Sequence, residues 1–193
     1  MALERLWVGR LPVEHEEAHH AADASQVAWV MQVICYDVSV KRRDRKSNCP
    51  VNVALETLGD PWTLLVVRDI VFHGKHTFSE FLASAERITT SVLADRLASL
   101  VSADILSKQP SSADRRKEFY QLTEKGLGLV PVLVEMATWS VQHDPLVRAN
   151  SYWLAKVRSD REGLYALIRN TVRAGGSVFC GDHNVIEQLA RGA

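Results

Sequence analysis

Apolar residues recur at helical spacing from residue 50 onward. Four of them fall on one helical face, at Val51, Ala54, Leu55 and Leu58. Pro50 suits the first turn of a helix because that turn needs no amide donor, and Gly59 suits a helix C-terminus. The pattern predicts a helix over residues 50–58.

The same signals for helix starts and ends recur further along the chain. Asp60 is suited to an N-cap and Pro61 to the next first turn, and Gly74 marks the following stop. The helix between them carries the apolar residues Trp62, Leu65, Ile70 and Phe72. A short helix is predicted from about Phe78, with Thr77 as its cap.

A longer amphipathic helix is predicted after Thr89, which serves as its cap. Its buried face carries leucines at spacing i, i+4 and i+7, namely Leu93, Leu97 and Leu100. The opposite face carries Thr90, Ser91, Asp95 and Ser99, with Arg96 at the flank. Together with the short helix and a turn at residues 86–88, this segment predicts a helix-turn-helix.

An extended segment begins at Ile105 and Leu106, is broken by a polar stretch at 110–114 and resumes at 119–122. The two parts predict a β-hairpin of the kind called a wing, with Arg115, Arg116 and Lys117 at its tip. Thr123 is then expected to cap a helix that kinks at Pro131. That helix carries Leu127, Val130, Val134, Ala137 and Trp139.

Both flanks are less regular. Residues 1–48 have no clear period, and the stretch at 29–40 fits either a strand or a short helix. A plain alternative is that the natural product begins at Met31. The C-terminal zone predicts a helix from about Asp160 to Ala174, ended by Gly175-Gly176 and followed by a loose tail.

The predicted fold class is therefore mainly α with a small β component. We expect a winged helix-turn-helix with a two-stranded wing and extra N- and C-terminal segments. The expected zones are an N-terminal extension at 1–48, the winged domain at 49–146 and a C-terminal helical extension with a tail at 147–193.

Composition places the 193-residue chain among ordinary globular proteins, with 47% hydrophobic and 24% charged residues. Cys35, Cys49 and Cys180 stand far apart without metal-ligand spacing, which favours a reducing compartment. The sequence shows neither a secretory signal nor a run long enough to cross a membrane. We expect a cytoplasmic protein with no membrane partner.

Motifs of common enzymes are absent from the sequence. It lacks a Gly-rich phosphate loop, a Gly-x-Ser-x-Gly elbow and a pair of histidines with a helical glutamate between them. His73 and His76 flank a turn, where surface histidines are far more common than metal ligands. We therefore expect no enzyme activity, no cofactor and no metal.

The charge of the chain bears on the function class that remains, nucleic-acid binding. The chain has 23 basic and 23 acidic residues, so its formal net charge is zero. Residues 49–143 carry nine basic and eleven acidic groups, which predicts modest non-specific affinity for DNA. The basic residues that favour DNA gather at the wing and at Lys41–Lys46, and Lys75 and Lys108 extend the wing's strip.

A series of short motifs resembles the HxlR-type winged helix-turn-helix transcriptional regulators. In order they are Cys49-Pro50-Val51, Leu58–Leu65, Arg68-Asp69, Phe78–Phe81, Ile88-Thr89, Val92-Leu93, Arg96-Leu97, Asp114–Arg116, Tyr120–Thr123 and Lys125-Gly126. The resemblance covers roughly Cys49 to Asp144, about half of the chain. It implies a homodimeric bacterial or archaeal repressor or activator that binds an inverted-repeat operator in double-stranded DNA. The sequence does not identify a small-molecule effector, and it leaves open whether the C-terminal helix adds to the dimer interface or holds a ligand.

Under that resemblance, candidate DNA-binding residues lie on the short helix, the longer helix and the wing. They are Ser79, Thr89, Thr90, Ser91, Asp95, Arg96, Lys108, Arg115, Arg116 and Lys117. The chain departs from the family pattern at the exposed helix face, where Ser91 and Asp95 stand in place of a common basic residue. The alternative is therefore a winged-helix protein-interaction module that does not bind DNA. A homodimer would use Leu127, Val130, Val134 and Ala137 together with the first helix.

Cys49 leaves two interpretations open. Some members of the resembled family use a cysteine at this place to sense oxidants or electrophiles. Here Cys49 begins a helix, whose dipole favours a thiolate, and Arg45 and Lys46 lie just before it. The plainer interpretation is a small, partly buried residue before a proline.

Overall fold

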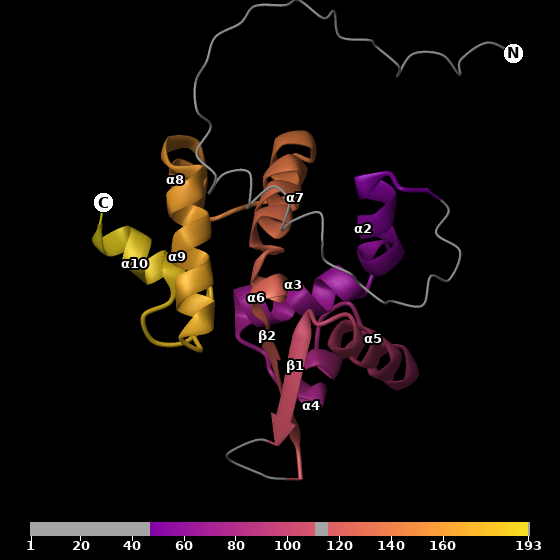
Figure 1. Cartoon of the computed structure of the whole chain (residues 1–193). Helices are drawn as coiled ribbons and strands as arrows, with labels where there is room; N and C mark the ends of the chain where they lie inside the picture. Colours follow the sequence, from indigo (N-terminus) through magenta and orange to yellow (C-terminus); the bar gives the residue numbers. More distant parts are fainter. Residues whose placement is uncertain (1–46, 111–115, 193) are drawn as a thin grey trace, which may run out of the picture. The chain divides into compact units, whose positions relative to one another are not determined.

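The structure, a computed structural model, describes residues 47–110 and 116–192. Four helices lead into a two-stranded sheet (Figure 1): α2 (Pro50–Leu58), α3 (Thr63–His73), α4 (Phe78–Leu82), α5 (Thr90–Ser102), then β1 (Leu106–Pro110) and β2 (Glu118–Leu122). The helices that follow are α6 (Glu124–Leu127), α7 (Val130–His143), α8 (Ser151–Ser159), α9 (Arg161–Arg173) and α10 (Val185–Arg191). The predicted fold class, a mainly helical winged helix-turn-helix, is confirmed.

The helix boundaries follow the sequence signals. Gly59 ends α2, and Gly74 ends α3 in the left-handed conformation with φ of 64°, which favours glycine. Asp60 Oδ1 accepts the amides of Trp62 and Thr63 at 2.9 and 3.0 Å in the turn before α3, but the N-cap of α3 is Trp62 and not Asp60 as predicted. Thr77 and Glu80 form a capping box at α4.

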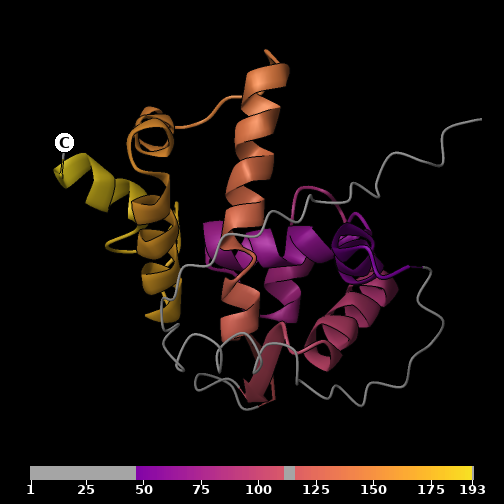
Figure 2. The ribbon, with the colours of Figure 1, turned by 45° about the horizontal axis from the view of Figure 1, so that its top comes forward.

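Helix α3 lies at the centre of the core. Its Val67, Ile70 and Val71 are completely buried, and it contacts α5, α7 and α9. In the turned view, α3 runs between α5 on one side and α9 on the other (Figure 2). The leucines Leu93, Leu97 and Leu100 of α5 are buried against it, as their spacing predicts.

The wing is an antiparallel hairpin in which Leu106 pairs with Leu122 and Lys108 with Tyr120. It extends away from the helices (Figure 1). Behind it, Gly126 of α6 lies against the carbonyl oxygen of Ile105, where any Cβ atom would collide. This close approach explains why a glycine follows the wing.

The predicted kink at Pro131 is instead a break between two helices. Thr123 caps α6, accepting the amide of Gly126 at 3.1 Å, but α6 ends at Leu127 and α7 begins at Val130. Proline cannot donate to the carbonyl four residues earlier, and its ring crowds that carbonyl. Pro131 therefore stands in the first turn of α7, where no donor is needed.

The C-terminal zone is more ordered than the sequence predicted. Helix α9 matches the expected 160–174 segment, whereas α8 was not predicted and the supposed loose tail contains α10. The amides of Val178 and Phe179 donate to the carbonyls of Val71 and Phe72 at 2.9 and 3.0 Å. The loose-tail prediction is therefore wrong, because this segment completes the last turn of α3.

Two asparagine caps mark the starts of the helices that were not predicted. Asn150 Oδ1 accepts the amide of Tyr152 at 2.9 Å at the start of α8, and Asn184 Oδ1 accepts that of Glu187 at 3.0 Å at the start of α10. The predictions for residues 1–46, including the Lys41–Lys46 cluster, and for Arg115 concern residues outside the described ranges.

Candidate nucleic-acid interface

Helix α5 has two distinct faces. Leu93, Leu97 and Leu100 are at most 2% exposed and fix the helix to the core. Thr90, Ser91, Asp95 and Ser99 are all exposed on the other side. The small hydroxyl groups at the N-terminal end are of a size that can approach base edges and phosphates in a major groove.

Thr89 occupies the N-cap position of α5, but its hydroxyl does not cap the helix. The hydroxyl oxygen lies 3.4 Å from that of Ser91, and only the Thr89 carbonyl joins the helix, accepting the Leu93 amide at 2.9 Å. The predicted side-chain cap is thus wrong. The Thr89 and Ser91 hydroxyls instead lie together on the exposed surface.

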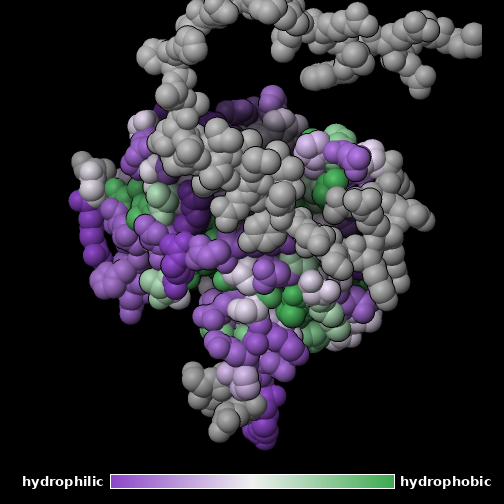
Figure 3. All heavy atoms as spheres, in the orientation of Figure 1, coloured by the Kyte–Doolittle hydropathy of each residue, from purple (hydrophilic) through white to green (hydrophobic). Residues whose placement is uncertain are grey.

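The described part of the wing is strongly polar, as the space-filling view shows at its projecting end (Figure 3). Lys108, Arg116 and Lys117 are exposed. Lys108 Nζ lies 3.4 Å from Glu118 Oε1 across the hairpin, an exposed pair that contributes little to stability. These cations are therefore placed where phosphates could reach them.

His76 joins the wing to the helix-turn-helix. Its Nδ1 lies 2.8 Å from the carbonyl oxygen of Tyr120, and its carbonyl accepts the Tyr120 amide at 2.8 Å. Its ring also stacks on Phe119, with centroids 4.5 Å apart. The sequence indicates a turn histidine at His76 and carries no signal for this pairing, because His76 belongs to no recognisable motif.

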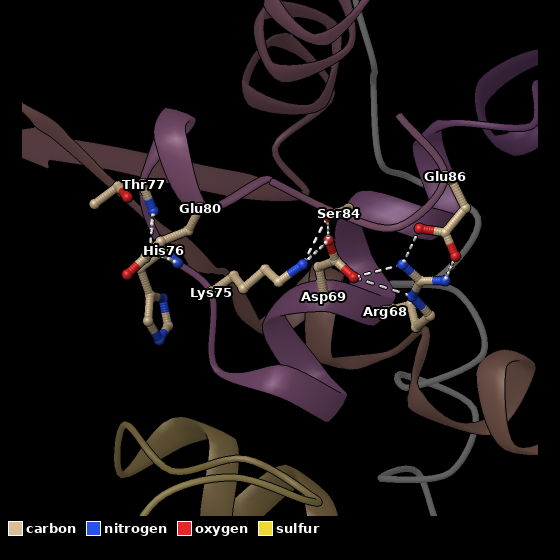
Figure 4. A network of polar contacts seen from close by, with 8 residues as sticks. All are labelled: Arg68, Asp69, Lys75, His76, Thr77, Glu80, Ser84 and Glu86. Atoms are coloured by element: carbon tan, nitrogen blue, oxygen red, sulfur yellow. Dashed lines mark hydrogen bonds and ion pairs between the residues drawn. The ribbon is translucent and has the colours of Figure 1, made fainter. Parts of the chain in front are cut away.

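A polar network fixes the turn that precedes α5 (Figure 4). At its centre is the buried carboxylate of Asp69, which accepts Arg68 Nε at 3.0 Å, Lys75 Nζ at 3.0 Å and the Ser84 hydroxyl. Arg68 also donates to Glu86, at 2.5 and 2.9 Å. The hydrogen bonds from Arg68 lower the pKa of Glu86 to about 2. The network ties α3 to α4 and to the turn that leads into α5.

Two predicted contact residues face inward in this arrangement. Lys75, expected to extend the basic strip, instead pairs with Asp69. Arg96 Nη1 lies 3.3 Å from Asp60 Oδ2, and its Nε is buried without a partner among the described residues. Arg96 therefore stabilises the turn between α2 and α3 through its ion pair with Asp60. The remaining described candidates, including Ser79 on α4, are exposed.

In the turn between α2 and α3, hydrogen bonds shift the pKa of Asp60. Burial alone disfavours the ionised form of Asp60, but hydrogen bonds from the Thr63 hydroxyl and from the amides of Trp62 and Thr63 outweigh it. The pKa of Asp60 is accordingly lowered, with Arg96 adding to the effect. An ionised Asp60 keeps Arg96 in place.

Three of the residues expected to form a dimer interface lie inside the molecule. Leu127, Val130 and Val134 are at most 2% exposed, because they pack into the core. That part of the prediction is wrong, whereas Ala137 is only half-buried. Other apolar residues are exposed on α2 and α7 instead: Val51, Leu55, Val132, Met136 and Trp139. A groove of about 480 Å³ runs between α2, α3 and α7, with Leu55, Leu64 and Met136 in its walls.

Cys49 is exposed at the N-cap of α2 rather than partly buried, and Cys180 is exposed near the C-terminal end.

Among residues 47–110 and 116–192, no cluster of three or more His, Cys, Asp or Glu is placed to hold a metal ion. No helix in these ranges is both long and apolar enough to span a membrane.

Comparison with known proteins gives a consistent picture. Residues 57–146 match a family model described as HxlR-like helix-turn-helix. Over 95 residues the chain is 35% identical to the uncharacterized HTH-type transcriptional regulator Rv3095 of Mycobacterium tuberculosis, a match covering 49% of this chain and 59% of that relative. It is 33% identical over 95 residues to the HTH-type transcriptional regulator YodB of Bacillus subtilis, covering 49% of this chain and 84% of YodB.

The solved structure of the reduced form of YodB matches with a TM-score of 0.42 and 29% identity, covering 53% of this chain and 100% of that one. The matched region spans little more than half of the mycobacterial relative. Rv3095 and YodB are both named as HTH-type transcriptional regulators, which are not enzymes, in agreement with the sequence prediction.

Proposed function

Because the chain belongs to the HxlR-like helix-turn-helix family, we propose that it is a transcriptional regulator that binds double-stranded DNA as a homodimer. The observation that carries this proposal is the exposed polar face of α5, held from behind by three buried leucines beside an exposed basic hairpin. A helix that packs through one face and exposes its polar face can enter the major groove while the hairpin contacts phosphates.

Each exposed group has a role in this arrangement. Thr90 and Ser91 would contact base edges, and Asp95 could accept a hydrogen bond from a cytosine amino group. Lys108, Arg116 and Lys117 would neutralise phosphates, and Arg115 would add to them at the tip. Few cations are involved, so we expect modest affinity that depends on two half-sites bound together.

The homodimer is supported by the exposed apolar residues of α2 and α7. Val51 is 66% exposed and Trp139 is 64% exposed, which is costly for large apolar side chains in water. Pairing two copies across these helices would cover them and present two α5 helices to an inverted repeat, with half-sites about 34 Å apart or a multiple of that.

The dimer is tested by sedimentation at micromolar concentration. Leu55→Glu should shift the protein to monomers, whereas Thr57→Glu should not, because Thr57 is exposed on another face of the same helix. A parent protein that sediments as a monomer would contradict the proposal.

DNA binding is tested by selecting bound fragments from genomic DNA and measuring their affinity across salt concentrations. A steep loss of affinity with salt indicates phosphate contacts. The exposed acidic Asp95 on α5 favours a second candidate, a winged-helix module that binds another protein. The absence of any bound fragment at low salt would support that candidate.

We also propose that oxidation of Cys49 alters DNA affinity, since its thiol is exposed at the start of α2, next to the apolar residues assigned to the dimer. A disulfide between the two copies would fix their relative orientation. A mild oxidant should change the affinity of the parent and of Cys180→Ser, but not that of Cys49→Ser. Equal responses from all three proteins would remove Cys49 from the proposal.

A further inference from the structure

A hollow of about 160 Å³ lies between α7, α8 and α9. Helix α9 contacts both α7 and α8, and in the turned view α8 and α9 lie on the other side of α7 from α5 (Figure 2). The wall of the hollow is apolar, formed by Val141, Leu154 and Val157. Thr138 also lines it, but its hydroxyl already donates to the carbonyl of Val134 at 2.7 Å. The interior therefore favours a ligand with an apolar body.

The rim of the hollow is basic. Arg158 and Arg161 both line it, together with Gln142. Arg161 Nη1 lies 3.3 Å from a carboxylate oxygen of Glu135, which also accepts the Tyr165 hydroxyl at 2.5 Å. Arg158 has no hydrogen bond or ion pair within the described ranges. One guanidinium group at the mouth is thus without an anionic partner there.

From this combination we propose that the hollow binds a small organic carboxylate. A cavity of roughly 150 Å³ accepts a benzene ring, so the volume suits a single-ring acid. The ring would lie against Val141, Leu154 and Val157, and the carboxylate would pair with Arg158, whose planar guanidinium matches it with two parallel hydrogen bonds.

Carboxylate binding can be tested separately from DNA binding. Arg158 and Arg161 lie outside residues 57–146, which match the family model, whereas Val141 and Gln142 lie inside them. Binding can therefore be measured on the full chain alone, and its failure would leave the proposed regulator intact.

Calorimetric titration of the full chain with benzoate tests the proposal, with benzyl alcohol as the uncharged analogue. Benzoate should bind at least tenfold more tightly than benzyl alcohol. Arg158→Gln should remove that preference, and Arg148→Gln, an exposed arginine outside the hollow, should retain it. Equal binding of the two compounds, or no heat with benzoate, would overturn the proposal.

A second variant separates the hollow from a surface contact. Val141→Phe places a larger side chain in the half-buried wall, and it should weaken benzoate binding about tenfold while circular dichroism shows an intact fold. Undiminished binding in this folded variant would show that benzoate lies elsewhere.

Discussion

Helix α5 and the wing belong to the same proposed DNA surface, but they are held in different ways. Three buried leucines fix α5 from behind, whereas in the two strands of the wing only Leu106 and Tyr120 are buried, and backbone pairing and His76 hold one edge. Packing holds a helix to fractions of an ångström, because a close-packed core has little free space. Base recognition needs such precision, and a phosphate contact tolerates a hairpin that moves.

The largest effect should come from removing part of the packing that holds α5. Leu97→Ala removes a side chain that is 2% exposed and should lower the free energy of unfolding by about 2–5 kcal/mol. Ser99→Ala, on the exposed face of the same helix, should stay within about 0.5 kcal/mol. Urea unfolding of both variants measures the difference. A small loss in Leu97→Ala would show that α5 is not fixed by its leucines.

The next effect concerns the wing's charge. Replacing Arg116 and Lys117 together by alanine should weaken binding to all DNA sequences by about tenfold and reduce the salt slope by about two. Anisotropy titrations at several salt concentrations measure both quantities. The control Arg148→Ala removes an exposed cation outside the proposed surface and should leave the slope unchanged. Undiminished binding in the double variant would refute the wing's assignment.

A smaller effect tests whether the wing moves independently of α5. His76→Ala removes the contact with the Tyr120 carbonyl and the Phe119 ring and should cost about 1 kcal/mol of unfolding free energy. Amide exchange should become faster in β2 than in α5, and His73→Ala, at an exposed position, should change neither. Equal acceleration in α5 and β2 would mean that they open as one unit.

The smallest effect lies in the turn before α5. Glu86 has a folded-state pKa of about 2, below its ordinary value of 4.5, so its ion pair with Arg68 stabilises the fold fully above about pH 5 and less as the pH falls toward 2. Glu86→Gln should flatten the decline in stability over that range. The change should be under about 1 kcal/mol, because the pair is partly exposed. Identical pH profiles would contradict this contribution.

The sequence was informative where structure is local. Short-range rules predict the ends of α2 and α3 at Gly59 and Gly74, the start of α6 after Thr123 and the leucine face of α5. The structure confirms all of these. The sequence was uninformative where a side chain meets a distant segment. Arg96 and Lys75 appear as available cations in the sequence, but Asp60 and Asp69, 36 and six residues away, pair with them and leave both side chains half-buried.

The mistaken dimer stripe has the same origin. An apolar stripe predicts that one face of a helix is covered, but it does not say whether the cover comes from the same chain or from a second copy. In α7 the stripe with Val130 and Val134 faces the core, and Met136 and Trp139 on other positions are exposed. Only the packing of α3 against α7 distinguishes the two.

The hydrogen bonds from residues 178–179 to the end of α3 bear on how the protein can be divided. Phe72 contacts Trp153 and Phe179, with ring centroids 5.7 and 5.6 Å away, so α8 and the segment before α10 shield the central helix from water. A fragment trimmed at residue 146 would leave that aromatic surface and the carbonyls of Val71 and Phe72 exposed. We therefore expect a fragment that ends at residue 146 to be less stable than the full chain, and the winged helix should be expressed with residues 147–192 attached.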